Sequence, residues 1–218
     1  GARKLDEITY DEMLELATLG AQVLHNRSVE MAKRYNVNLE VLSSFTGNPG
    51  TKVKEVVKNM EKSHVSGVAK DKNVARLALV GLADEPGIAF KIFSLLAKKK
   101  INVDIILQSV GREGTKDISF TVSQEDLKPA LAILEEYQEP MTIREIKWED
   151  TVAKISIVGA GMMSNPGVAA KLFESLYNNG ININMISTSE IRITVLIDEK
   201  EIDKAMQAVH DGFGLGDV

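Results

Sequence analysis

An internal repeat constrains the fold of this 218-residue chain more than any other feature of its sequence. Pro86 recurs as Pro166 and Asn102 recurs as Asn182, so the spacing is 80 residues at both points. The same register is thus kept through a whole helix-forming segment and into the strand that follows it. Chance similarity does not preserve such a register, so the sequence predicts two domains that share one fold.

Each copy has the pattern strand, helix, two strands, helix. In the first copy the strands are predicted at 77–82, 103–110, 118–122 and 142–148, and the helices from 88 and over 124–137. In the second copy the strands are predicted at 155–158, 183–187 and 192–197, and the helices from 168 and over 201–213. Only the first copy completes β-α-β-β-α-β, the split ferredoxin-like arrangement. We expect a strand at 64–69, which precedes the first copy, to complete the second sheet, so that the first domain is inserted into the second.

Residues 1–60 are unrelated to the repeat. Thr9 and Glu12 have the spacing of a capping box and predict the start of a helix. A second helix is predicted at 21–35 and one strand at 39–45. Because two helices and one strand make a poor independent core, we expect this segment to be the end of a larger α/β domain.

The composition excludes several classes of protein. The chain has 26 Lys and Arg residues against 31 Asp and Glu, a net charge of −5, no cysteine and three distant histidines. Nucleic-acid binding needs a concentrated basic face, and zinc sites need clustered Cys or His, so we expect neither nucleic-acid partners nor a metal site. The histidines are expected to be surface or structural residues. No apolar stretch reaches the roughly 18 residues of a spanning helix, and no signal peptide is evident, so we expect a cytoplasmic protein without a membrane partner.

Several blocks of the sequence resemble aspartate kinases. Residues 5–17 (LDEITYDEMLELA), 20–30 (GAQVLHNRSVE), 43–45 and 50–51 are similar to the end of the amino-acid-kinase domain of that family. Residues 158–162 (VGAGM), 165–168 (NPGV) and 186–192 (ISTSEIR) are similar to its two regulatory ACT domains. The resemblance implies an α+β fold of tandem ferredoxin-like βαββαβ ACT domains behind an α/β kinase remnant. The implied boundaries are 1–60 for the remnant, 73–149 for the first ACT domain, and 63–70 plus 151–218 for the second.

The resemblance also implies a function. Aspartate kinase is a phosphotransferase that uses ATP and Mg²⁺ to phosphorylate the β-carboxylate of aspartate, the first step toward lysine, threonine and methionine. Its nucleotide loop and aspartate-binding residues belong to an N-terminal kinase part that we expect to be missing here. The chain alone is therefore expected to be catalytically incomplete, without catalytic residues or a cofactor of its own. Arg27, Ser28 and Thr51 are expected only at the fringe of that site.

The ACT domains of this family bind a feedback inhibitor, lysine or threonine or both, between ACT units, and they dimerise through their sheets. Carried onto the matching positions, the resemblance implies an effector site in each copy. In the first copy these positions are Asp84, Glu85, Pro86, Gly87, Ile88, Ala89, Asn102, Val103, Asp104 and Gln108. In the second copy they are Val168, Ala169, Asn182, Ile183, Ser189 and Glu190.

The residue chemistry suits such a ligand independently of the family. Backbone N–H groups that follow a Pro-Gly turn at a helix start can bind a carboxylate. Asn102 and Asp104 offer acceptors for an ammonium, and Asp84, Glu85 or Glu190 can pair with the second ammonium of lysine. Gln108 and Ser189 are suited to distinguish polar from apolar side chains. Asn184 replaces Asp104 in the second copy, which weakens the preference for a cation there.

Other interpretations remain open from the sequence. The Pro-Gly pairs are compatible with simple helix-start turns, and Asn102 and Asp104 with polar residues at a strand entry. The segment 159–164 imitates a dinucleotide fingerprint, although Ser164 replaces its third glycine. The chain is also compatible with a separate regulatory subunit, for which Met60 offers an internal start, or with a complete nucleotide-dependent enzyme.

Overall fold

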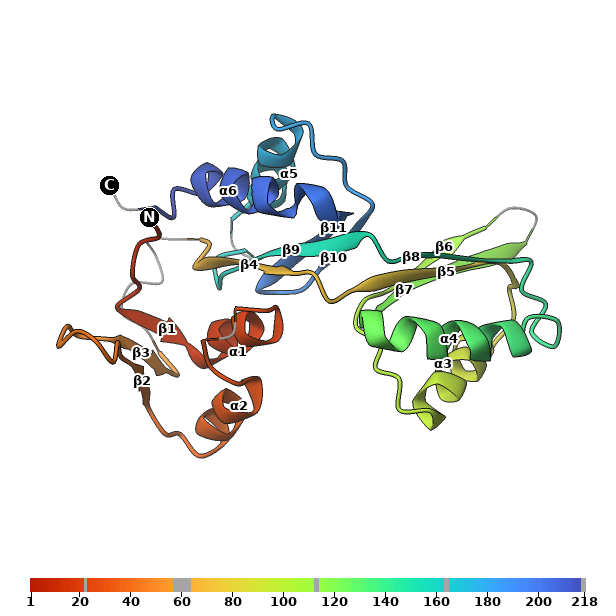
Figure 1. The fold of residues 1–218 in the computed structure, drawn as a ribbon, viewed down its shortest axis with the longest axis horizontal. Coiled ribbons are helices and arrows are strands. Elements are labelled where there is room, and N and C mark those ends of the chain that lie inside the picture. The colour runs from red at the N-terminus through yellow and green to blue at the C-terminus, as the bar shows by residue number, and fades with distance from the viewer. Residues whose placement is uncertain (22, 57–63, 112–113, 163–164, 217–218) are drawn as a thin grey trace. The chain divides into compact units, whose positions relative to one another are not determined.

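The computed structural model describes residues 1–21, 23–56, 64–111, 114–162 and 165–216 (Figure 1). The chain forms two compact units, one of residues 72–153 and the other of residues 1–71 with 154–218. Met60, residue 63 and Ser164, which the sequence analysis singles out, lie outside the described residues.

The unit of residues 72–153 has the predicted β-α-β-β-α-β order. Its elements are β5 (Ala75–Ala83), α3 (Ile88–Lys98), β6 (Ile106–Val110), β7 (Thr115–Val122), α4 (Gln124–Glu136) and β8 (Glu145–Glu149). The sheet order is β6-β7-β5-β8, and each neighbouring pair is antiparallel. The last strand begins at Glu145, three residues later than predicted, after a turn in which Thr142 has a positive φ of 55°.

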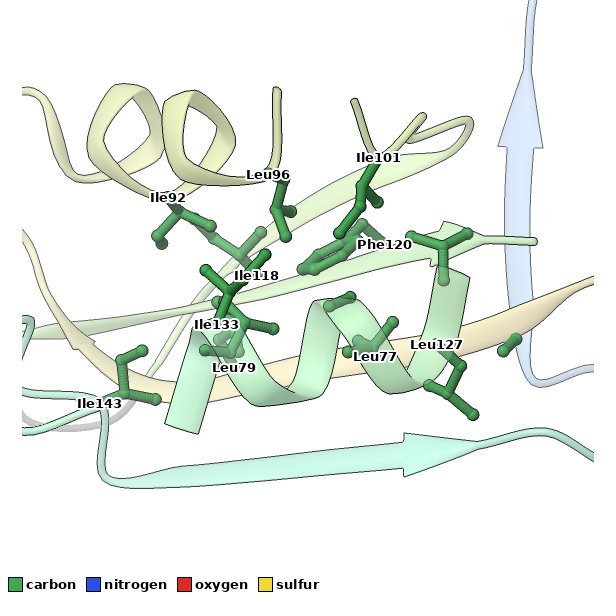
Figure 2. Packing of buried hydrophobic residues seen from close by; sticks show 14 of the residues in the cluster. Leu77, Leu79, Ile92, Leu96, Ile101, Ile118, Phe120, Leu127, Ile133 and Ile143 are labelled. Carbon is green, nitrogen blue, oxygen red and sulfur yellow. The ribbon is translucent and has the colours of Figure 1, made fainter. Parts of the chain in front are cut away.

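Alternating apolar residues build the core of this unit. Leu77 and Leu79 of β5 and Ile118 and Phe120 of β7 lie between the sheet and its two helices (Figure 2). Period-two alternation puts these side chains on one face of the sheet. Phe93 is half-buried and packs against this core, where its ring meets that of Phe120 edge to face at 5.4 Å between centroids.

The second copy is completed by a strand from before the first copy. Its elements are β9 (Val152–Val158), α5 (Val168–Tyr177), β10 (Met185–Thr188), β11 (Arg192–Asp198), a 3-10 turn (Glu199–Glu201) and α6 (Ile202–Gly212). The sheet order is β10-β11-β9-β4, and β4 (Gly67–Asp71) pairs antiparallel with β9. This confirms the predicted insertion of the first copy into the second. The strand begins at Gly67 and not at residue 64, because Ser66 and the two residues before it form a loop.

The N-terminal segment has more strands than predicted. It contains β1 (Glu7–Thr9), α1 (Tyr10–Thr18), α2 (Asn26–Arg34), β2 (Leu39–Val41) and β3 (Thr51–Lys54). The strands form a sheet of order β1-β3-β2, in which β1 and β3 are parallel. The prediction of a single strand was therefore wrong. Strands of three or four residues show no usable periodicity, and the β1-β3 pair joins residues more than forty positions apart.

Ile8, Tyr10, Met13, Val29 and Val53 form a small buried cluster in this segment. The predicted capping box is present, because Thr9 and Glu12 hydrogen-bond reciprocally at the start of α1. None of the described helices is long and apolar enough to cross a membrane.

Candidate functional site

A pocket of about 350 Å³ lies at the start of α5, in the unit that contains the second copy. Its lining comes from three places in the sequence: the loop before β4, the start of α5 and the end of α6. The lining residues are His64, Val65, Asn165, Pro166, Gly167, Val168, Lys171 and Phe213.

The start of α5 supplies this pocket with hydrogen-bond donors. Gly167 is the N-cap residue, with φ 99° and ψ −8°, and as a glycine it has no side chain to cap the helix. The first N–H groups of a helix have no partner within the helix. Lys171, one turn further on, lies with its ammonium 5.2 Å from the centre of the Phe213 ring. Amide donors, a positive helix end and an ammonium together favour an anionic group such as a carboxylate.

Two glycines allow His64 to reach this pocket. A Cβ on Gly159 would lie 2.3 Å from the backbone oxygen of His64, and a Cβ on Gly161 would lie 2.8 Å from its Cα. A residue with a Cβ cannot replace either glycine unless the backbone of His64 moves away. Close packing of the two backbones therefore explains both glycines of the apparent dinucleotide fingerprint, and no bound nucleotide is needed to explain them.

The corresponding turn of the first copy has the same backbone but different polar surroundings. Gly87 has φ 93° and caps α3 without a side-chain hydrogen bond. Asp84 forms an ion pair with Lys116 at 2.7 Å, and Glu85 forms one with Lys91 at 3.2 Å. Both acidic residues are exposed, and exposed ion pairs contribute little free energy, so a ligand ammonium can exchange with either lysine.

One domain does not bring the two halves of its predicted site together. Asp84 lies beside Lys116, near the start of β7, whereas the N–H of Asp104 donates to the carbonyl of Thr121, near its end. Lys116 and Thr121 are five positions apart along the strand, which corresponds to about 17 Å.

The second copy repeats this separation. The N–H of Gly159 donates to the carbonyl of Ile191, whereas that of Asn184 donates to the carbonyl of Leu196. The helix-start half and the strand-entry half of each predicted site therefore lie near opposite ends of the same sheet.

Comparisons with known proteins agree with this architecture. A model of the ACT domain matches residues 77–138 and 155–213. A solved structure described as aspartokinase alpha and beta subunits is 48% identical, with a TM-score of 0.65, and the match covers 69% of this chain and 99% of that chain. The regulatory subunit of aspartate kinase from Thermus thermophilus, in its ligand-free form, is 40% identical with a TM-score of 0.66 and the same coverage. The chain belongs to the aspartokinase family of ACT-domain proteins.

Curated aspartokinases extend the comparison to nearly the whole chain. The aspartokinase of Mycolicibacterium smegmatis is 44% identical over 219 residues, which cover 99% of this chain and 52% of the relative. That of Bacillus sp. (strain MGA3) is 46% identical over 214 residues, with coverage of 98% and 52%. The chain thus spans about half the length of these relatives. The fold prediction of tandem ACT domains is confirmed.

The remaining predicted positions of the aspartokinase ACT domains are divided between the two sheet ends. Ser189 and Glu190 are exposed in the turn between β10 and β11, at the same end of the sheet as the pocket. Asn182 and Ile183 lie at the other end, where the amide of Asn182 donates to the side-chain oxygen of Asn184 at 3.4 Å.

In the first ACT domain, Gln108 is exposed on β6, opposite Ile118. Asn102 is exposed and Val103 half-buried, and Pro86 is exposed at the turn. Ile88 and Val168 are buried, whereas Ala89 and Ala169 are half-buried.

Of the eight described residues that line the pocket, only Val168 was among the predicted site positions. Lys171 has a repeat partner in Lys91, and its position one turn after the Pro-Gly pair was a usable signal. His64 and Phe213 carried no local signal, because they reach the pocket from segments distant in sequence. Among the fringe residues, Arg27 and Ser28 are exposed at the start of α2, and the Thr51 hydroxyl donates to the carbonyl of Leu5.

A larger hollow of about 1020 Å³ lies beyond α4 in the first ACT domain. Glu135, Glu136 and Glu139 contribute to its lining, with Arg144 as the basic residue. Because three carboxylates repel an anion, this hollow suits an anionic ligand less well than the pocket at α5. Among the described residues, no group of His, Asp or Glu has the geometry of a metal site.

Proposed function

We propose that the chain is the allosteric regulatory region of an aspartate kinase and binds a feedback-inhibiting amino acid, lysine or threonine or both. The observation that carries this proposal is the pocket at α5, with its uncapped helix start and Lys171. Such a pocket matches the carboxylate that every free amino acid presents. A structure of E. coli aspartokinase III in complex with lysine and aspartate (T-state), 25% identical with a TM-score of 0.75, supports lysine as one candidate.

The enzyme as a whole transfers a phosphoryl group from ATP to the β-carboxylate of aspartate. In our proposal ATP and Mg²⁺ bind to the part of the full-length enzyme that this chain does not match, and no catalytic residue is assigned here. The curated aspartokinases, of which the chain covers 52%, support this division. We also propose a cytoplasmic location, as expected of an enzyme of amino-acid biosynthesis.

The effector site is proposed to lie between ACT domains. The separation of about 17 Å between the two halves within each domain supports this, because one free amino acid cannot reach both. The edge strands provide a means of association. Ile106 and Leu107 of β6 and Ile186 of β10 are exposed apolar residues on unpaired edges, which suits a homodimer formed through the ACT sheets.

Calorimetric titration of the chain with L-lysine and L-threonine, separately and together, tests this function. We expect at least one of them to bind, and Lys171→Met to weaken that binding about tenfold or more because a charge-assisted contact is lost. Lys91→Met is the matched control at the corresponding position of the other copy, and it should change the affinity less than twofold. Absence of binding by both amino acids would refute the proposal.

A separate regulatory subunit is the second candidate. It is supported by the Thermus thermophilus regulatory subunit, 99% of which is covered by this chain at 40% identity. Immunodetection in cells separates the two candidates: a single larger polypeptide favours the regulatory region, and a separate short chain favours the subunit.

A further inference from the structure

Helix α1 is fixed to the second ACT domain by the buried carboxylate of Glu12. Glu12 is only 4% exposed. One of its oxygens, Oε2, accepts from the N–H of Thr9 at 3.2 Å and from the Thr9 hydroxyl at 2.8 Å. The other, Oε1, accepts from the Ser66 hydroxyl and, at 3.1 Å, from the N–H of Ala160. Oε2 thus bonds the cap of α1, whereas Oε1 bonds the ACT domain.

Both partners of Oε1 belong to segments that border the pocket. Ser66 directly follows His64 and Val65, which line it. Ala160 stands between Gly159 and Gly161, whose backbones pack against His64. The two segments also contact each other, since the N–H of Ser66 donates to the carbonyl of Val158 at 2.7 Å.

The rest of α1 packs on the same domain. Glu15, one turn after Glu12, pairs with Arg192 of β11 at 3.0 Å. Leu16 and Leu19 contact Ala69 of β4 and Val158 of β9. Lys70, next to Ala69 in β4, points to the face of the sheet that α6 covers and pairs with Asp203 of that helix. Ala69 therefore points to the other face, and the register of β4 and β9 puts Val158 on that same face. The N-terminal segment therefore covers the face of the sheet that α6 leaves free.

We propose that Glu12 is a positioning residue that couples the occupancy of the pocket to the start of α1. This coupling rests on the proposed effector binding. A ligand that contacts His64 shifts the segments at residues 64–66 and 159–161, and Oε1 follows its two donors because a buried carboxylate without donors is strongly disfavoured. Because Oε2 of the same carboxylate accepts from the capping residue Thr9, the shift reaches the first turn of α1.

Three variants of the 218-residue chain separate this coupling from simple helix stability. Ser66→Ala removes a donor of Oε1 and leaves the cap, whereas Thr9→Ala removes the cap hydroxyl and leaves both donors of Oε1. Glu12→Gln alters both sides, because its amide group cannot accept from donors at both ends. Amide hydrogen exchange of residues 10–18, 64–66 and 159–161 is measured without ligand and with millimolar lysine or threonine, and binding is followed by calorimetry.

Without ligand, we expect Glu12→Gln to accelerate exchange at residues 159–161 about tenfold or more, and Thr9→Ala to leave it unchanged. With a bound effector, exchange in α1 should change about fivefold or more in the wild type but less than twofold in Glu12→Gln. Ser66→Ala keeps the Ala160 donor, and Thr9→Ala keeps the Thr9 N–H donor, so each should give an intermediate change. Unchanged exchange at 159–161 in Glu12→Gln, or an unchanged α1 in an effector-bound wild type, overturns the coupling. If neither amino acid binds the wild type, the proposed function fails, and the ligand-free comparison still decides whether Glu12 links α1 to the pocket.

Discussion

Replacement of Gly167 by alanine measures the free-energy cost of a positive φ at the start of α5, beside the pocket. Gly167 has φ 99°, a conformation that residues with a Cβ rarely adopt. A Cβ added there meets no atom within 4 Å, so steric contact contributes nothing to the cost. The remaining cost is backbone strain. We therefore expect Gly167→Ala to lower the free energy of unfolding by about 1 to 2 kcal/mol.

Two matched substitutions make this expectation specific. Gly87→Ala, at φ 93° and also without atoms within 4 Å, should cost the same amount in the other unit. Gly47→Ala also has open space, but its φ lies outside the left-handed range, so it should be neutral or slightly stabilising.

Urea denaturation combined with peptide-resolved hydrogen exchange measures the three variants. Exchange data are needed because the chain has two units, which can unfold at different urea concentrations. Each φ-positive variant should destabilise its own unit. If Gly167→Ala is as stable as Gly47→Ala, positive φ is not the reason for glycine at this position. The argument that the backbone at residue 167 is held in a special conformation for ligand binding is then refuted.

Three further predictions concern the rest of the fold. Thr9→Ala should lower the unfolding free energy by about 1 kcal/mol through loss of the α1 cap, as measured by denaturation. Phe120→Ala should cost about 3 to 5 kcal/mol, because the ring is fully buried against Phe93, and thermal melting should show it. The hydrogen bond from Lys33 to Asp11 raises the pKa of Lys33 above 10.5. The stabilisation by this pair is therefore complete below that pH and is lost as the pH rises through the folded-state pKa of Lys33. Asp11→Asn should bring the pKa of Lys33, measured by NMR, back toward its ordinary value.

The sequence predicted those parts of the fold that depend on local patterns and on the repeat. The Pro-Gly pairs identified both helix starts, and their positive φ values of 93° and 99° explain why glycine stands there twice. The strand before the first copy was assigned to the second sheet because the second copy lacked a fourth strand. This is an argument from completeness and needs no knowledge of side-chain contacts.

Long-range contacts account for what the sequence did not predict. The capping box revealed one role of Glu12, but its contacts with Ser66 and Ala160 join residues 54 and 148 positions away. No periodicity or turn signal encodes such a pairing. His64 was likewise interpreted as a surface or structural residue, although the glycines at 159 and 161 leave room for it at the pocket.

The distance between the two halves of each site bears on which residues an effector uses. An amino acid whose carboxylate lies at the start of α5 is about 17 Å from the strand entry of the same domain, so Asn184 is out of reach of its ammonium. Glu190, exposed in the turn between β10 and β11 at the pocket end of the sheet, is the anionic candidate in this domain. A pairing of Lys171 with the ligand carboxylate and of Glu190 with a ligand ammonium neutralises both ligand charges. Glu190→Gln should therefore weaken effector binding together with Lys171→Met, whereas Asn184→Ala should not, and calorimetry that finds the opposite order would place the ammonium at the strand entry.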